Sequence, residues 1–446
     1  MARSVKIRPM NSSNLSSDTI SDDIKMEREN AIMDSEKRRK MFTDIITGTL
    51  SEEINYCKFI LEGMASLVCI IIPTIGYTLV PFHNVILSPE FWYELPLQAA
   101  FFAIPLVVAN GILRSSFYLN VGFLKNKSFF IKALLGIEIF FLVSFLTTYF
   151  VWSKIAGYHG PIPFSVYIFG LIMTLGIFAI IWHQFPMEWR KNDSFKRRLW
   201  SLLIATMLNN FLASLSGFVV GILFYAIPLR FQWTIALVLP LVREFSIWLI
   251  RIFVRRSADG DQLKAEITCS EAYGASHALN ILYAVGSMAT HETSTLILGT
   301  DFLINIFICC KIIYCRKKRQ HDIDKPIQLL QELVINEMIE LVLPLAYFAT
   351  LLIAFFGPNS ELIGNIVSNY WQYTPIEDLD HTITCVLMFF FVDIGSLFAS
   401  EILLWIICRI KLHQAFIAIY AEFGIVFTIQ VGYNLSLVST VTFYCF

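Results

Sequence analysis

The chain has 446 residues, of which 56% are hydrophobic and only 15% are charged. A soluble domain usually carries about 25% charged residues, so this composition excludes an ordinary set of soluble domains. The formal net charge of −1 excludes the strongly basic surface on which nucleic-acid binding depends. The apolar residues come in runs, and about 20 apolar residues suffice for a helix to cross a bilayer. The sequence therefore predicts an all-α protein, a polytopic transmembrane helical bundle.

The first segment is predicted to be cytoplasmic. Residues 1–40 are rich in Ser, Asn and charged residues without apolar periodicity, which predicts a disordered tail. Apolar residues then recur at helical spacing from Phe42 to Ile54, which predicts a juxtamembrane amphipathic helix at 41–58. Two placements of this helix stay open. It lies on the inner leaflet and binds anionic lipids, or it packs against the cytoplasmic face of the bundle. The basic residues expected to contact anionic lipids are Lys37, Arg38, Arg39 and Lys40.

Eleven apolar runs are predicted to span the membrane, eight within 59–315 and three within 336–446. Their bounds are 59–82, 95–118, 130–153, 162–184, 199–227, 231–254, 268–290, 292–314, 336–357, 382–409 and 413–440. Between the two groups, residues 316–335 predict a cytoplasmic amphipathic linker helix, which continues into the ninth span with a bend near Pro344.

The basic residues predict the orientation, because cytoplasmic loops retain Lys and Arg. With a cytoplasmic N-terminus, all but three of the 34 Lys and Arg residues fall in cytoplasmic segments. The exceptions are Lys154, Arg230 and Arg243. Eleven crossings then place the C-terminus on the extracytoplasmic side. The predicted location is a membrane, and the sequence does not identify which one.

Ionisable residues inside the predicted spans form a candidate binding site near the membrane midplane. These residues are Arg243, Glu244, Asp301, Asp393, Glu401 and Glu422. A charge at the bilayer centre costs about 2.5–3.5 kcal/mol on insertion scales, so each needs a partner or a hydrated cavity. One arginine cannot neutralise the acids, so the others must be protonated, hydrogen-bonded or balanced by a cation. Pro240 predicts a kink in the sixth span, about one turn before Arg243.

These features favour a secondary transporter or channel for a small polar or charged solute, with a proton or another cation as its coupling partner. The alternative is a membrane receptor, sensor or interaction protein without a transport pathway, which would work through the tail and the 316–335 helix. The sequence contains no P-loop, dinucleotide fingerprint or hydrolase motif, so neither an enzyme nor a cofactor is predicted. His and Cys show no metal-ligand spacing, so no metal site is predicted. The solute and the oligomeric state stay open.

Overall fold

The computed structural model describes residues 36–48, 127–155, 165–185, 187–228, 233–255, 291–318, 323–358 and 375–420, with a few isolated residues between them. Within these ranges every regular element is helical, which confirms the predicted all-α class for this part of the chain. The first, second and seventh predicted spans lie wholly or almost wholly outside the described residues, as do residues 1–32 of the predicted tail.

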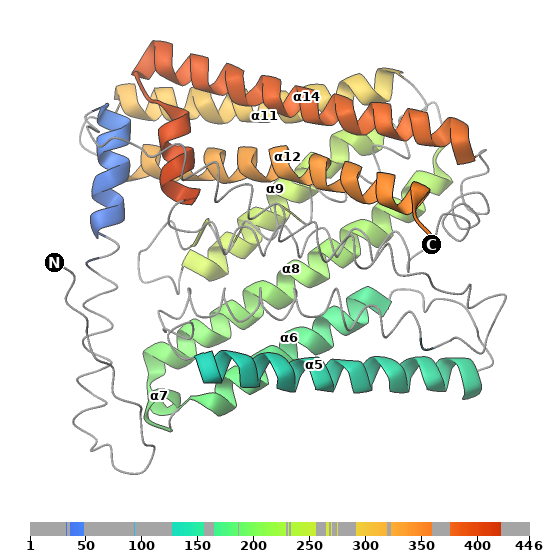
Figure 1. The fold of residues 1–446 in the computed structure, drawn as a ribbon. Helices are drawn as coiled ribbons and strands as arrows, with labels where there is room; N and C mark the ends of the chain where they lie inside the picture. Colours follow the sequence, from blue (N-terminus) through green and yellow to red (C-terminus); the bar gives the residue numbers. More distant parts are fainter. Residues whose placement is uncertain are drawn as a thin grey trace.

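The long helices form a bundle in which α12 is central. The elements are α5 (Lys127–Phe150), a π-helical turn (Val151–Ile155), α6 (Ser165–Gln184), α7 (Met187–Lys191), α8 (Asp193–Ala226), α9 (Trp233–Arg255), α11 (His291–Lys318), α12 (Asp324–Phe356) and α14 (Pro375–Cys408). Helices α11, α12 and α14 pack against one another, α9 packs against α11 and α8, and α6 packs against α8 and α5 (Figure 1).

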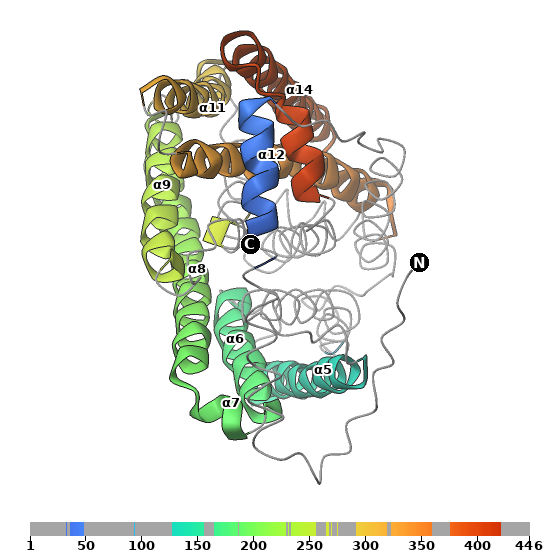
Figure 2. The same cartoon turned by 90° about the vertical axis from the view of Figure 1, so that its left-hand side faces the viewer.

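The first half of helix α12 is buried on every side. All ten residues from 331 to 340 are buried, and a helix that is buried all round lies inside its fold. Figure 2 shows α12 between α9, α11, α14 and the helix at 36–47. The predicted linker region 316–335 is divided between two long helices, because α11 extends to Lys318 and α12 begins at Asp324. Helix α12 then continues through Pro344.

The helix at residues 36–47 lies across one end of the bundle (Figures 1 and 2). Phe42, Ile45 and Ile46 are at most 2% exposed and belong to the hydrophobic core of the bundle. The apolar face of this helix therefore packs against the bundle, which is one of the two placements that the sequence left open. The helix begins at residue 36, so the last residues of the predicted tail are helical.

Further contacts lie near the two ends of this helix. The guanidinium of Arg39 donates from Nε to Oδ1 of Asp324 at 2.7 Å and from Nη2 to Oδ2 at 3.1 Å. Asp324 is the first residue of α12. At the other end of the helix, Gly48 adopts a φ of 74°, where a Cβ would lie 3.6 Å from the carbonyl oxygen of Arg409. Lys37 and Lys40 of the basic run are exposed, whereas Arg38 is buried.

The end of α14 forms the second half of this contact. Arg409 has a φ of 58°, a left-handed conformation that ends the helix. Its amide N–H donates to the carbonyl of Trp405 at 2.9 Å, and the amide of Ile410 donates to the carbonyl of Leu404 at 3.3 Å. The chain turns there into a short helix at 412–420, which lies beside the helix at 36–47 in both views (Figures 1 and 2).

Two of the described helices are long and apolar enough to cross a membrane. They run over Leu298–Lys318 in α11 and Ile383–Cys408 in α14. Both correspond to predicted spans, the eighth and the tenth.

Phe42→Ala is expected to loosen the helix at 36–47 from the bundle, because truncation of a buried Phe costs about 3–5 kcal/mol. Hydrogen exchange of amides 43–48, measured by mass spectrometry on the full-length protein, should become faster. Lys40→Ala changes an exposed position of the same helix and should leave the exchange unaltered. Equal exchange in the two variants would contradict this packing.

Candidate functional site

Four carboxylates are buried together between α11, α12 and α14. Asp301 belongs to α11, Glu337 and Glu340 belong to α12, and Asp393 belongs to α14. None of the four residues is more than 4% exposed. Asp393 lies close enough to Glu340, Asp301 and Glu337 for their negative charges to act on one another. We refer to these four residues, with Asn305, Ser396 and Ser400, as the carboxylate cluster.

Helical spacing explains why these side chains meet. Asp301 and Asn305 are four residues apart in α11, and Asp393, Ser396 and Ser400 follow at intervals of three and four in α14. Residues at these spacings share one face of a helix. The polar faces of α11 and α14 are therefore turned toward α12.

The opposite faces of the same two helices are apolar and exposed. On α11 the side chains of Leu303 and Phe307 are 65% and 59% exposed, and on α14 those of Phe391 and Phe398 are 64% and 63% exposed. A surface helix of a soluble protein has the reverse arrangement, with its apolar stripe inside and its polar face outside. Both helices are therefore polar within the bundle and apolar on its surface.

Hydrogen bonds connect the three helices through the cluster. The amide nitrogen of Asn305 donates to Oε2 of Glu340 at 2.8 Å and to Oγ of Ser396 at 3.1 Å. The hydroxyls of Ser396 and Ser400 both donate to Oε1 of Glu337, at 3.2 and 3.3 Å. Because these donors are amide and hydroxyl groups, they bring no positive charge to the carboxylates.

The cluster has more acceptors than these donors can satisfy. Oδ1 of Asn305, Oε2 of Glu337 and Oδ2 of Asp393 are buried without a hydrogen-bond partner. An amide nitrogen has two hydrogens and a hydroxyl has one, so the donors of Asn305, Ser396 and Ser400 are fully used by the bonds above. A buried acceptor without a donor costs about 1–3 kcal/mol, and more when it is charged. Each of these three oxygens therefore favours a bound proton or cation.

The cluster lies at one level of the bundle. At about 1.5 Å of rise per residue, Asn305, Glu337 and Ser396 are each roughly 18–20 Å from the end of the bundle at which α11 finishes, α12 starts and α14 finishes. The agreement among three helices means that the polar groups form a layer across the bundle. Apolar core residues such as Ile312, Leu330 and Leu404 separate this layer from that end.

The structure brings Asp301 and Asp393 of the predicted site residues together. Glu401 lies elsewhere: Oε1 is 2.8 Å from Nδ1 of His413, and Oε2 accepts the backbone N–H of His413 at 2.8 Å. Glu401 thus joins α14 to the start of the 412–420 helix, and its carboxylate connects two segments at the bundle end. Glu244 is half-buried on α9.

For the other predicted site residues the structure describes the backbone at most. Helix α9 is continuous through positions 240 and 243, but the side chains of Pro240 and Arg243 lie outside the described part of the structure. Glu422 also lies outside it. Because α9 packs against α11, Arg243 belongs to a helix next to the cluster.

Glu337 and Glu340, which supply half of the carboxylates, were not among the site residues predicted from the sequence. A signal was present, since the two acids are three residues apart, a helical spacing, inside a predicted span. They stand near the predicted start of the ninth span, where a charge would be expected to face the cytoplasm. Their burial results from the central position of α12, which no local pattern of residues reveals.

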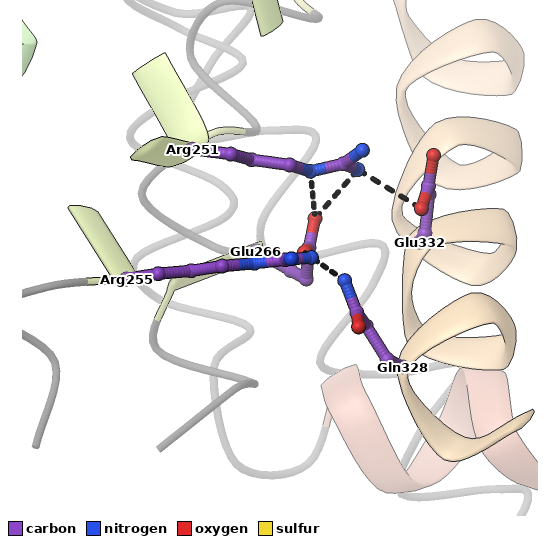
Figure 3. Close-up of polar contacts among 5 residues, drawn as sticks. All are labelled: Arg251, Arg255, Glu266, Gln328 and Glu332. Carbon is purple, nitrogen blue, oxygen red and sulfur yellow. Dashed lines mark hydrogen bonds and ion pairs between the residues drawn. The ribbon is translucent and has the colours of Figure 1, made fainter. Parts of the chain in front are cut away.

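A second polar network joins α9 to α12 near the start of α12. Arg251 donates to Oε2 of Glu266 from Nε at 3.1 Å and from Nη2 at 2.8 Å, and Nη2 also lies 3.0 Å from Oε2 of Glu332 (Figure 3). Arg255 lies 3.6 Å from Oε1 of Glu266, to which Gln328 donates at 3.3 Å. Two arginines and two glutamates make this network electrically balanced, unlike the carboxylate cluster.

Glu266 is the most buried charge of this network, with its side chain 1% exposed against 15% for that of Arg251. Burial raises the pKa of Glu266 above its ordinary value of 4.5, and the guanidinium of Arg251 opposes that rise. Burial disfavours the charged form of Glu266, and the ion pair with Arg251 favours it.

Comparisons with known proteins identify no relative: no family model, no curated protein and no solved structure matches this chain. In the described part of the chain no group of three or more His, Cys, Asp or Glu residues is arranged to hold a metal ion.

Arg251→Ala is expected to make stability depend on pH. Without the guanidinium, the pKa of Glu266 should rise further above 4.5 in the folded state. The folded chain then binds a proton more tightly than the unfolded chain, so stability is retained at low pH and lost as pH rises through the folded pKa. The thermal unfolding midpoint, measured from about pH 5 to about pH 8, should fall relative to that of the wild type. The loss should approach about 3–5 kcal/mol at the upper end, as for a broken buried ion pair.

The matched control for this measurement is the double variant Arg251→Ala with Glu266→Gln. It lacks the Glu266 carboxylate, so its unfolding midpoint should depend less on pH than that of the single variant Arg251→Ala. A single variant whose midpoint follows that of the wild type at every pH would show that Arg251 does not stabilise the charge of Glu266.

Proposed function

We propose that this chain is a multi-pass membrane protein of about eleven spans, with a cytoplasmic N-terminus, and that it acts as a secondary transporter or channel for a small polar or charged solute. The observation that carries the proposal is the carboxylate cluster, which lies inside a group of helices whose outer faces are apolar. Protons or another cation serve as the coupling partner.

The inverted polarity of α11 and α14 supports the membrane part of the proposal. Only 33% of the residues in the most apolar stretch of either helix are buried within the protein. In a soluble protein such a helix would be mostly buried, and an exposed apolar surface of this extent would cause aggregation. Lipid provides the apolar surroundings that Leu303, Phe307, Phe391 and Phe398 require.

The distribution of basic residues supports the orientation. The last turns of α9 and α11 carry Arg255 and the run Arg316, Lys317 and Lys318. The ion pairs to Glu332 and Asp324 bring α9 and the 36–47 helix to the first half of α12, so these basic segments share one end of the bundle. Basic residues collect on the cytoplasmic side of membrane proteins, which favours this end as the cytoplasmic one.

The cluster supports transport because its charge is uncompensated by the donors that contact it. Helix packing alone does not require buried charge, because a buried ion pair can often be replaced as a whole by apolar residues without loss of stability. A coupled transporter instead needs groups that bind and release a proton or another cation as the pathway opens. The alternative function, that of a receptor or interaction protein, treats the four carboxylates as packing groups.

We expect Asp393→Asn to abolish transport. Proteoliposomes of the full-length protein would carry an inward gradient of protons or Na⁺ and receive labelled amino acids, sugars, organic anions and nucleosides in turn. The wild type should accumulate at least one class above the level of protein-free liposomes, and Asp393→Asn should reduce that accumulation at least about tenfold, as expected for loss of about 1.4 kcal/mol or more at a charged site.

The control is Glu138→Gln, which neutralises an acid on α5, on the opposite side of the bundle from α11 and α14 (Figure 1). It should leave accumulation unchanged. Unchanged accumulation in Asp393→Asn would remove the cluster from the transport mechanism. If the wild type accumulates none of the solute classes and passes no current across a planar bilayer, the receptor or interaction alternative replaces transport.

A further inference from the structure

We propose that the carboxylate cluster binds a monovalent metal cation, an alkali ion such as Na⁺, through oxygens of Asp393, Asn305 and Glu337. This inference rests on the proposed function, because it names the coupling ion of the same site. It follows from the three buried oxygens without partners and from the kinds of group that carry them.

The unpartnered atoms are all oxygens, and they come from three different helices. They are Oδ1 of Asn305 on α11, Oε2 of Glu337 on α12 and Oδ2 of Asp393 on α14. Carboxylate and carbonyl oxygens are the ligands that hard cations prefer. Each of these residues is at most 3% exposed, so bulk water does not replace the missing partner.

The amide of Asn305 distinguishes a metal ion from a proton. An amide oxygen does not take up a proton at ordinary pH, whereas it coordinates metal ions readily. Both hydrogens of its nitrogen are used, one by Glu340 and one by Ser396, and these bonds fix which atom of the amide remains for a ligand. A proton held on a carboxyl group satisfies one acceptor at a time, while a single metal ion contacts several oxygens at once.

The arrangement of the acids favours a monovalent over a divalent ion. Within the described residues no three carboxylates converge in the geometry of a metal centre. Divalent ions such as Ca²⁺ bind where several carboxylates meet the ion directly. A site that combines one or two carboxylates with amide and hydroxyl oxygens matches an ion of lower charge. Carriers hold their coupling Na⁺ or protons at sites near the membrane midplane.

The test is binding of radioactive Na⁺ to the purified full-length protein in detergent, with unlabelled Na⁺, Li⁺, K⁺ or choline as competitor at constant ionic strength and pH. We expect saturable binding that an alkali cation displaces and choline does not. Asp393→Asn preserves the shape of the side chain and should weaken binding at least about tenfold, since even indirect support of a metal ligand contributes about that much. Glu138→Gln on α5 should bind as the wild type does.

A second measurement applies if Asp393→Asn does not fold. Bound alkali ion stabilises the folded wild type by mass action, so its thermal unfolding midpoint should rise with Na⁺ concentration when Na⁺ replaces choline. A midpoint that responds to pH but to no alkali cation would mean that the cluster holds protons only, and it would overturn the inference. Absence of saturable Na⁺ binding to the wild type would overturn it as well.

The outcomes separate this inference from the proposed function. If the wild type binds no alkali ion but accumulates solute in proteoliposomes, and Asp393→Asn stops that accumulation, transport stands and the alkali ion is excluded as its coupling ion. If the wild type binds the ion but transports nothing and conducts no current, the ion site stands and the transport function fails.

Discussion

The four carboxylates placed in the interior of the bundle set the main physical constraint on this structure. Like charges in a medium of low dielectric constant repel strongly, and each loses its hydration on burial. Asn305, Ser396 and Ser400 contribute hydrogen bonds to this layer without contributing charge. Positive charge in this layer, as protons or as a bound cation, favours close packing of the helices that carry these groups. If the proposed ion site exists, stability and ion occupancy are linked in this part of the protein.

Helix α12 contributes residues to both polar regions, the balanced ion-pair network and the carboxylate cluster. Its residues 331–340 are buried on all sides, and they include Glu332 of the balanced network and Glu337 of the carboxylate cluster. These two glutamates are five residues apart, roughly 7.5 Å along the helix axis. One is compensated by Arg251 and the other is bonded by serine hydroxyls. The two glutamates therefore differ in their partners over a short distance, and only Glu332 is paired with an arginine among the contacts of the described residues.

The helical class and several of these positions follow from the sequence because they depend on local pattern. Apolar runs predict the eighth and tenth spans, and the isolated acids Asp301 and Asp393 stand out inside them. Glu337 and Glu340 could not be placed in the same way, because their burial depends on which helices surround α12. Glu401 was predicted to lie near the midplane because of its depth in the tenth span. Its contact with His413 instead depends on the turn at Arg409, which the sequence pattern does not predict. Local periodicity gives the face of a helix, and only tertiary packing gives its neighbours.

The bundle end near the start of α12 is held by contacts of a different kind from those in the interior. Arg39 pairs with Asp324 at an exposed position, where an ion pair contributes only about 0–1 kcal/mol. The buried side chains of Phe42, Ile45 and Ile46 therefore supply most of the attachment of the 36–47 helix. The same helix lies against the turn at Arg409, which follows directly from α14. Because α14 carries Asp393, Ser396 and Ser400, a displacement of the 36–47 helix acts on the helix that supplies three members of the carboxylate cluster. Any rearrangement of the cluster that moves α14 along its axis must in turn be accommodated at this contact.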